Sequence, residues 1–375
     1  MGNKKICHLT SVHPRYDTRI FHKECKTLSN SGFDVNLIVA DGKRDEVVDK
    51  IKIYDVGKPK NRKERMFKTT SKIFQKALEV NADIYHFHDP ELILIGIKLK
   101  KLDKKVIYDV HEDVPEQILS KDYVPKFFRI ILAPSFNFLE KIFSKFLDYI
   151  VTSTDFIKNK FVKYNTNVID IKNYVSMEYI KITTNTKKKQ ERTEFVLVFA
   201  GGIYKERDIL EGVKACNILK ELPIRFVLYG KIELNYFYEI KKIDTLGRLD
   251  YKGELPYEKV LMELAESDLG FICDYPKKRH IMGLPVKLFE YMAVGIPVIA
   301  SNFPLWKMIV EENNCGICVD PTKPEEIAKA IEYLITHPDE AKKMGENGRK
   351  AVLEKYNWEM ESEKLIDLYN KLLNK

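Results

Sequence analysis

Short apolar runs alternate with longer amphipathic segments along the whole chain. The runs predicted to form strands are 5–10, 35–40, 84–88, 106–110, 148–153, 167–171, 195–200, 225–230, 249–251, 269–273, 297–300 and 316–319. Between them, apolar residues recur at helical spacing, as with Phe21, Cys25 and Leu28. Strands that alternate with helices favour parallel sheets covered on both faces, so the pattern predicts an α/β fold.

One polar stretch divides this pattern into two series. Residues 183–194 contain no apolar side chain, and 375 residues are more than one hydrophobic core usually serves. We therefore expect an N-terminal domain at 1–183, a linker at 184–194 and a C-terminal domain at 195–353. A final helix over 354–375 is expected to pack back on the N-terminal domain. Ligands of such domains bind at the carboxyl ends of the strands.

Composition narrows the class of protein. The chain is 45% apolar and 31% charged, as in globular proteins, and no run approaches the ~18 apolar residues of a membrane span. Residues 1–6 lack the apolar segment of a signal peptide. Of the six cysteines only Cys315 and Cys318 are close in sequence, which favours small buried residues over a redox pair or a zinc site. A reduced, cytoplasmic protein is expected.

Positive charge is concentrated in the first half of the chain. Residues 1–194 contain 37 Lys and Arg against 26 Asp and Glu, whereas residues 195–375 contain 26 against 29. The densest stretch, 58–76, is either a solubilising face or a surface for anionic membrane lipids. Segment 125–146 is amphipathic and predicts either a core helix or a membrane-docking helix. No basic-aromatic repeat indicates an RNA-binding module, so no nucleic-acid partner is expected.

The strongest candidate site lies in residues 281–301 (IMGLPVKLFEYMAVGIPVIAS). Pro285 can begin a helix, whose first N–H groups would lie beside Lys287. Glu290 follows three residues later on the same face, so the pair suits the phosphates and ribose of a nucleotide. A surface Lys–Glu pair is the alternative. The chain has no Asp-x-Asp pair to clamp a metal, so cations and helix N-termini would have to neutralise a diphosphate.

A second candidate is the His86-Phe87-His88 triplet at the end of a predicted strand. The two imidazoles alternate on the strand and therefore face one side, where a metal could bind them. No third ligand follows from the sequence. A structural or site-lining role is therefore favoured, and no metal is expected.

Beyond these patterns, the chain resembles a known family. Residues 281–301 match P-x-K-x-x-E-Y-M-A-x-G-x-P-V-I-A-S of the retaining, GT-B-fold glycosyltransferases of family 4, also called group 1 glycosyltransferases. Similar signposts occur in the expected order at 11–19 (SVHPRYDTR), 88–92 (HDPEL), 108–112 (YDVHE), 201–207 (GGIYKER) and 251–255 (YKGEL). The resemblance covers nearly the whole chain and is strongest to members that build microbial surface polysaccharides.

The resemblance assigns roles to the matching positions. Glu290 matches the carboxylate that binds the donor ribose, and Lys287 and Arg207 match cations that hold the diphosphate. His111 matches the histidine that contacts the donor sugar near the reacting carbon. His111, Arg207 and Lys287 are thus the expected catalytic residues. The other expected substrate-binding residues come from three loops and are His13, Arg15, Arg19, Gly201, Gly202, Gly283, Leu284 and Pro285.

Two positions depart from the family pattern. The family often has a glutamate eight residues before Glu290, where this chain has Met282; the nearest polar side chains are Arg279 and His280. The basic residue usual at the glycine pair is also missing. Arg207 and Lys287 are therefore expected to carry more of the diphosphate charge.

The resemblance implies a metal-independent enzyme without cofactors, whose two Rossmann-like domains face each other across a cleft. It would transfer a sugar from a nucleotide-diphosphate sugar, with retention, to a glycan or lipid-linked acceptor in cell-surface polysaccharide biosynthesis. Its expected location is the cytoplasm, with the basic half at the inner face of the cell membrane. A sugar-nucleotide epimerase of the same fold and a non-catalytic nucleotide-sugar-binding protein are the alternatives.

Overall fold

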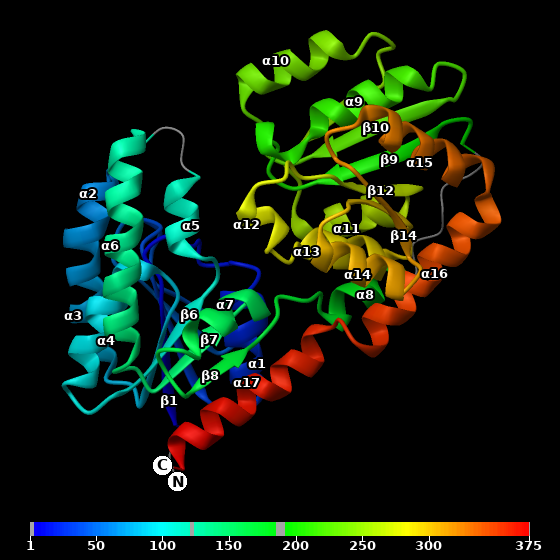
Figure 1. Ribbon diagram of the computed structural model, residues 1–375. Helices are drawn as coiled ribbons and strands as arrows, with labels where there is room; N and C mark the ends of the chain where they lie inside the picture. Colours follow the sequence, from blue (N-terminus) through cyan, green and yellow to red (C-terminus); the bar gives the residue numbers. More distant parts are fainter. Residues whose placement is uncertain (1–3, 121–123, 185–191, 375) are drawn as a thin grey trace. The chain divides into compact units, whose positions relative to one another are not determined.

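The computed structural model describes residues 4–120, 124–184 and 192–374, and the chain forms two compact units (Figure 1). The N-terminal unit comprises residues 1–173 and 359–375, and the C-terminal unit comprises residues 174–358. The chain thus enters the second unit about ten residues before the linker predicted at 184–194, of which residues 185–191 lie outside the described residues.

The early boundary has a packing cause. Tyr174, Val175 and Ile180 are buried in the core of the C-terminal unit, and the last two flank the start of α8 (Met177–Thr184). Helix α8 contacts α11 and α13 of the same unit. The polar composition of 183–194 hides this boundary, because the apolar residues that join the second core precede it.

The N-terminal unit is built on an eight-stranded sheet of order β3-β4-β2-β1-β5-β6-β7-β8, in which every neighbouring pair is parallel except β3 with β4. Its strands are β1 (Lys5–Leu9), β2 (Asp34–Val39), β3 (Glu46–Val48), β4 (Ile51–Asp55), β5 (Ile84–Phe87), β6 (Lys105–Val110), β7 (Tyr149–Thr152) and β8 (Val168–Asp170). The β3–β4 hairpin is not predicted by the sequence. Its turn uses Asp49 and Lys50 at positive φ, without the glycine that usually marks such turns.

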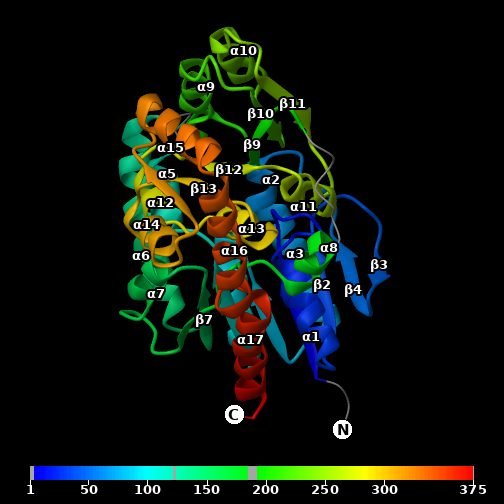
Figure 2. The ribbon, with the colours of Figure 1, turned by 90° about the vertical axis from the view of Figure 1, so that its right-hand side faces the viewer.

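Helices cover both faces of this sheet (Figures 1 and 2). Cys7 and Leu9 of β1 face the core formed with α3 and α4, whereas Ile6 and His8 lie on the opposite face, toward Tyr369 of α17. The helical segments are η1 (Ile20–Cys25), α1 (Lys26–Asn30), α2 (Arg62–Glu64), η2 (Arg65–Thr69), α3 (Thr70–Val80), η3 (Pro90–Leu92), α4 (Ile93–Lys100), α5 (Val114–Leu119), α6 (Lys126–Ser144), α7 (Asp155–Phe161) and α17 (Trp358–Leu373).

The C-terminal unit is built on a six-stranded parallel sheet of order β11-β10-β9-β12-β13-β14. Its strands are β9 (Phe195–Ala200), β10 (Ile224–Tyr229), β11 (Leu249–Gly253), β12 (Leu269–Ile272), β13 (Val298–Ser301) and β14 (Gly316–Val319). The helices are α8, η4 (Lys205–Arg207), α9 (Ile209–Ile218), α10 (Leu234–Ile243), α11 (Tyr257–Ala265), α12 (Lys278–Ile281), α13 (Val286–Val294), α14 (Pro304–Glu312), α15 (Pro324–Thr336) and α16 (Pro338–Glu354). The predicted pair of parallel α/β domains is confirmed.

Helix α6 settles one alternative left open by the sequence. Only Ala133, Glu140 and Ser144 of this helix are buried, and most of its large apolar side chains are exposed, with Phe127 at 69%. The segment is therefore not a core helix whose apolar side packs on the sheet. Within the described residues, no helix is both long enough and apolar enough to cross a lipid bilayer.

Both sheets reverse the direction in which strands are added at one point, between β1 and β5 in the N-terminal unit and between β9 and β12 in the C-terminal unit. The connections on either side of such a point run to opposite faces of the sheet, which leaves room beyond the strand ends. These two strand-order reversals are where the topology favours binding sites.

Candidate functional site

At the strand-order reversal of the C-terminal unit, glycines allow the backbone segments that follow β9 and β10 to approach each other closely. Gly201 follows β9 at φ 136° and Gly230 follows β10 at φ 126°. A Cβ on Gly230 would collide with the carbonyl of Gly201, so neither position tolerates a side chain easily. Gly202, also predicted as a site residue, comes next in the chain, followed by the 3-10 turn η4.

The Lys287 side chain lies over Gly201. A Cβ built on Gly201 would lie 3.1 Å from Nζ of Lys287, and Nζ is 5.1 Å from the centre of the Phe199 ring. Desolvation by burial, and then the positive charge of Arg207, lowers the pKa of Lys287 to about 8. No carboxylate of the described residues forms an ion pair with Lys287. The negative charges of Asp274 and Glu290 oppose this lowering, but neither carboxylate forms an ion pair with Lys287. The site therefore presents a half-buried ammonium group without an ion-pair partner among the described residues.

Arg207, at the end of η4, is the second predicted cation. Its guanidinium donates from Nη1 to Oδ2 of Asp274, and it lies 5.4 Å from the centre of the Tyr204 ring. Asp274 is 1% exposed and lies two residues after the end of β12, where Ser301 Oγ accepts from its backbone N–H. Asp274 is not among the residues predicted from the sequence. Its position shortly after a buried strand, at the strand-order reversal, is the feature of the sequence that could have indicated a role in the site.

Helix α13 brings the third group of predicted residues to the same edge. Pro285 is its N-cap, so the first N–H groups of the helix lack partners in earlier turns of the helix. The carbonyl of Gly283 accepts from Nε1 of Trp306 at 2.8 Å, which holds the turn that includes Leu284. Glu290 is 8% exposed on the first turns of α13. Burial, and then the charge of Glu290 and a hydrogen bond with it, raises the pKa of Tyr257 well above its usual range.

The side chains offered as substitutes for the missing glutamate are already engaged. Arg279 forms an ion pair with Glu206, which also binds Nζ of Lys277 at 2.6 Å. His280 Nδ1 lies 2.9 Å from the carbonyl of Tyr275. Met282 itself is half-buried. The position of the absent carboxylate thus adds no negative charge near Lys287.

The reversal of the N-terminal unit is organised differently, around Asp89. This carboxylate accepts from Thr10 Oγ1 at 2.8 Å and from the backbone N–H of Ser11 at 2.6 Å. The predicted residue His13 lies in the same loop, with Nδ1 3.0 Å from Asp17 and Nε2 3.6 Å from Asp89. These neighbouring carboxylates raise the pKa of His13 despite its burial.

The two predicted arginines of this loop bind carboxylates of their own unit. Arg15 is 2% exposed and forms a bidentate pair with Asp41 at 2.8 Å, with Glu46 on its other nitrogen. Arg19 is 3% exposed and forms a bidentate pair with Asp109 at 2.9 and 3.0 Å. Neither guanidinium can reach a substrate phosphate without giving up these bonds. Both arginines are bound within the N-terminal unit, and a contact of either one with substrate stays a prediction.

His111 follows β6 and joins a network of buried polar side chains. Its Nε2 lies 3.1 Å from Oδ2 of Asp109 and 3.2 Å from Nδ1 of His88, and its ring centre is 5.1 Å from that of His13. Burial raises the pKa of Asp109, but the charge of Arg19 and the hydrogen bonds with His111 and His88 outweigh it and hold this pKa well below its usual range. Asp109 therefore stays ionised and fixes the orientation of His111.

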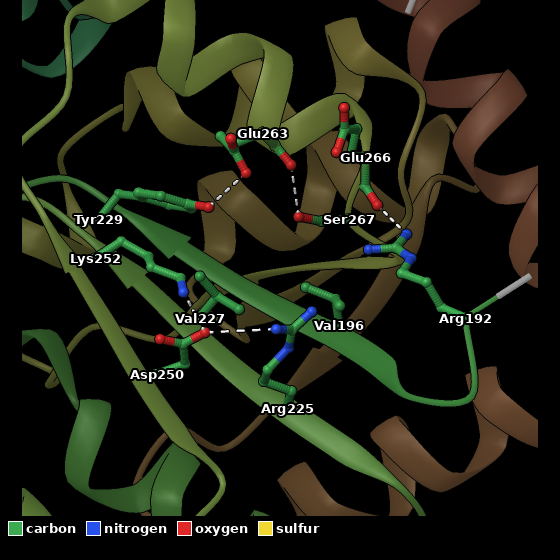
Figure 3. Close-up of a pocket in the computed structure, with 10 residues that line it drawn as sticks. All are labelled: Arg192, Val196, Arg225, Val227, Tyr229, Asp250, Lys252, Glu263, Glu266 and Ser267. Atoms are coloured by element: carbon green, nitrogen blue, oxygen red, sulfur yellow. Dashed lines mark hydrogen bonds and ion pairs between the residues drawn. The ribbon is translucent and has the colours of Figure 1, made fainter. Parts of the chain in front are cut away.

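A second hollow of the C-terminal unit lies away from these residues, against β9, β10, β11 and α11 (Figure 3). Figure 3 shows Lys252 and Arg225 turned toward Asp250, and Tyr229 turned toward Glu263. Asp250 lies 2.9 Å from Lys252 and 3.6 Å from Arg225, and Tyr229 donates to Glu263 at 2.7 Å. Its charges are largely neutralised by these pairs, which makes it a weaker candidate than the strand ends.

Comparison with family models matches most of the chain. The model for "Glycosyl transferases group 1" matches residues 181–351, and the model for "Glycosyltransferase Family 4" matches residues 18–175. The first match contains Arg207, Lys287 and Glu290, and the second contains Arg19 and His111.

Curated relatives and solved structures agree with these matches. The chain is 25% identical over 194 residues to an uncharacterized glycosyltransferase of Methanocaldococcus jannaschii, covering 50% of this chain and 48% of that protein. It spans about half or less of the length of the first curated relatives that it matches. Sucrose-phosphate synthase from Thermosynechococcus elongatus has a TM-score of 0.77 at 15% identity, covering 99% of this chain and 100% of that one. Anabaena HepE in complex with UDP and glucose has a TM-score of 0.73 at 14% identity, covering 98% and 100%.

Proposed function

Because this chain belongs to the group 1 glycosyltransferases and has the GT-B fold, we propose that it transfers a sugar from a nucleotide-diphosphate sugar to a glycan or lipid-linked acceptor. The observation that carries the proposal is the ammonium group of Lys287. It lies against the glycine turn after β9, beside Arg207 and close to the start of α13, without a carboxylate partner among the described side chains. A diphosphate supplies the charge that this place lacks.

The remaining contacts of the donor follow from the same elements. Glu290, four residues into α13, accepts hydrogen bonds from the ribose hydroxyls, and the N–H groups of the first turn of α13 face the phosphates. Asp274 keeps the Arg207 guanidinium in one orientation while its other nitrogens stay available. UDP and glucose are named in the structure of HepE, which shares the fold, and this supports a nucleotide-sugar donor.

The chemistry proposed is transfer with retention. Cleavage of the anomeric C–O bond leaves positive charge on the sugar and negative charge on the departing diphosphate. Lys287, Arg207 and the α13 N-terminus stabilise the leaving group because they are fixed before the bond breaks. The acceptor hydroxyl attacks from the same face, and its proton passes to the departing phosphate oxygen. No metal ion and no cofactor takes part in this step.

In the N-terminal unit, we assign the acceptor to the loop at the end of β1 and to His111. Asp109 keeps His111 in place. The family resemblance is the ground for expecting His111 to act near the reacting carbon. Asp89 performs the corresponding task for the loop of His13. Arg15 and Arg19 support these side chains through their carboxylate pairs.

The surface of the N-terminal unit favours an acceptor held at an anionic membrane on the cytoplasmic side. Helix α6 exposes the apolar side chains Phe127, Phe128, Ile130, Ile131, Leu132, Phe138 and Leu139. The basic stretch 58–76 is largely exposed and includes Met66 and Phe67, which are also exposed. Exposed aromatic groups near lysines are typical of peripheral membrane contacts. A lipid-linked precursor of a surface polysaccharide is the acceptor that fits this surface.

A panel of nucleotide sugars tests the donor proposal. One member is expected to raise the melting temperature of the full chain, because a ligand that binds only the folded state stabilises it. The same donor should be hydrolysed or transferred with release of nucleoside diphosphate, and NMR should find the anomeric configuration retained in the product. Lys287→Met should remove the thermal shift. Lys205→Met, the control at an exposed lysine of η4, should keep it. Equal shifts in both variants would contradict the site.

Vesicle sedimentation tests the membrane proposal. Binding is expected to vesicles with anionic lipids, to fall with added salt, and to be absent with neutral lipids. A fourfold charge reversal in the basic stretch should abolish it: Lys58→Glu, Lys60→Glu, Lys63→Glu and Lys68→Glu. A control with the same change of net charge in the C-terminal unit should bind as the wild type does: Lys241→Glu, Lys242→Glu, Lys342→Glu and Lys343→Glu. An equal loss of vesicle binding in both variants would show that the stretch 58–76 acts only through the net charge of the protein.

A further inference from the structure

Four side chains that the transfer reaction does not use meet inside the N-terminal unit. They come from β1, from η1 and from the end of β5, and their candidate ligand atoms all lie within 4.8 Å of one another; they are His8, Glu24, His86 and His88. His8, Glu24 and His86 are 0% exposed and His88 is 3% exposed. The sequence indicated only the last two histidines, because the partners come from segments about 60 to 80 residues earlier.

Three of the ligand atoms form a triangle of the size that a small divalent metal requires. Nδ1 of His8 and Nε2 of His88 are 3.0 Å apart, and Oε2 of Glu24 lies 3.8 Å from each of them. A point equidistant from these three atoms would be about 2.1 Å from each, which is the length of Zn–N and Zn–O bonds.

His86 offers the fourth ligand. Its Nδ1 lies 2.8 Å from the hydroxyl of Tyr369, whereas its Nε2 has no hydrogen-bond partner in the described part of the chain. A buried nitrogen without a partner costs free energy unless something binds it. Nε2 is therefore the atom of His86 that remains for an ion.

The outer nitrogens of the other two histidines are held as well. Nε2 of His8 lies 3.2 Å from the Tyr369 hydroxyl, and Nδ1 of His88 lies 3.3 Å from Oδ2 of Asp109. Histidines that bind metals usually have a polar partner on the nitrogen that faces away from the ion. Here each of the three has one. The inner nitrogens of His8 and His88 face each other at 3.0 Å, so either a shared proton or a bound ion joins them.

Glu24 lies beside a second buried carboxylate, Asp109, and burial, and then the charge of Asp109, raises the pKa of Glu24 well above its usual range. Neither of its oxygens accepts a hydrogen bond from the described residues. Nε of Arg19 lies 3.0 Å from Oε1, but the guanidinium already forms a bidentate pair with Asp109. Two buried carboxylates therefore share one arginine, and Oε2 faces the histidines. Either a proton or a cation completes this cluster.

We propose that these four side chains bind a structural zinc ion. Three imidazoles and one carboxylate form a nitrogen-rich set of four ligands, which suits tetrahedral zinc better than calcium or magnesium, since those ions prefer oxygen. The four ligands are closed off from solvent, so the ion is taken up as the chain folds and takes no part in sugar transfer. It ties β1, β5 and η1 together beneath the Tyr369 of α17 and holds His88, which contacts His111. This inference does not depend on the proposed function.

Metal analysis of the full chain tests the proposal. The protein is produced in zinc-supplemented medium, freed of any histidine tag and passed over a chelating resin before elemental analysis. About one zinc ion per chain is expected. Glu24→Gln and His86→Asn should each lower the zinc content at least fivefold, while His337→Asn, an exposed histidine of the C-terminal unit, should keep it.

A second measurement, on wild-type protein in which cobalt replaces zinc, does not depend on whether the variants fold. Wild-type protein produced with cobalt in place of zinc should show the intense visible absorption of tetrahedral cobalt(II), and brief treatment of the folded protein with a chelator should leave that absorption and turnover unchanged. Wild-type protein that contains less than about a fifth of an ion per chain and lacks these bands would overturn the proposal. The cluster would then be a hydrogen-bonded network in which Glu24 keeps a proton.

Discussion

The two units share a strand order around their reversals, but they leave opposite groups without partners there. In the C-terminal unit a cation lacks an ion-pair partner, since Lys287 lies beside Arg207 and no carboxylate of the described residues is bound to it. In the N-terminal unit lone pairs are in excess, because both oxygens of Glu24 and Nε2 of His86 lack hydrogen-bond donors in the described part of the chain. One place suits an anion and the other suits a cation.

The difference shows that the strand order determines where a binding site can form, and that the side chains at that point determine the charge of the ligand that binds. Parallel strands that end at a reversal leave space whatever the sequence. In the N-terminal unit, Asp89, Asp109 and their partners fill that space with bonds within the protein. In the C-terminal unit, glycines keep it open and the ammonium group stays unpaired. The first arrangement favours rigidity, whereas the second favours binding of a charged substrate.

Removing the unpaired cation should have the largest effect. Lys287→Ala is expected to lower turnover roughly 10²- to 10³-fold, the usual size for one group that stabilises a charged leaving group. Lys205→Ala should stay near wild type, because Lys205 is 75% exposed in the same loop as Arg207. Steady-state rates at saturating donor measure both.

Arg207→Ala should also lower turnover, together with the free energy of unfolding, since Asp274 would lose its partner. Normal turnover in Lys287→Ala would contradict the claim that the unpaired cation of the C-terminal unit stabilises the leaving group.

The ribose contact should come next in size. Glu290→Gln is expected to weaken donor binding by about 10- to 100-fold, because charge-assisted hydrogen bonds contribute about 1.5–3 kcal/mol. Calorimetry measures the affinity, and Glu311→Gln, an exposed glutamate of α14, is the matched control. Donor affinity that is unchanged in Glu290→Gln would remove Glu290 from the site.

A smaller loss of turnover is expected from a change in the N-terminal unit, where the polar side chains are bound to one another. His111→Ala should reduce turnover about tenfold, the effect of losing one hydrogen bond of about 1.5 kcal/mol, and should leave nucleotide affinity nearly unchanged. Melting curves of the same variant separate two roles for His111. A fall in stability that accounts for the lost activity would make this histidine purely structural.

The pH dependence should show the smallest effect. The pKa of Lys287 is about 8 without ligand, and a bound diphosphate should raise it. Binding near pH 9 is therefore expected to take up most of one proton, and affinity should fall as the pH rises through 8. Calorimetry in two buffers of different ionisation enthalpy measures the uptake, which Lys287→Met should abolish. Proton release, or equal uptake in that variant, would contradict the unpaired ammonium group.

Much of this architecture could be predicted from local sequence. The strand runs and the segment around Lys287 and Glu290 were found because period, turn residues and spacing act within a few positions. The β3–β4 hairpin was missed because its turn lacks glycine, and the boundary at 174 was missed because apolar residues precede the polar stretch.

Long-range pairing explains the rest. Asp274 meets Arg207 across 67 residues, and Tyr369 meets His8 across 361. Nothing within either segment marks these partners, since each depends on which strands the sheet sets side by side. The roles expected for Arg15 and Arg19 came from the family resemblance of their loop, and the carboxylates that bind them lie 26 and 90 residues away.

Calorimetry of a nucleoside and its diphosphate tests the central claim most directly, with the base taken from the best donor of the panel. Wild-type protein should bind the diphosphate much more tightly than the nucleoside. Lys287→Ala should weaken diphosphate binding about tenfold or more, as expected for a charge-assisted contact, and should change nucleoside binding less than about twofold. An equal loss for both ligands, or none for the diphosphate, would show that Lys287 does not recognise the phosphates.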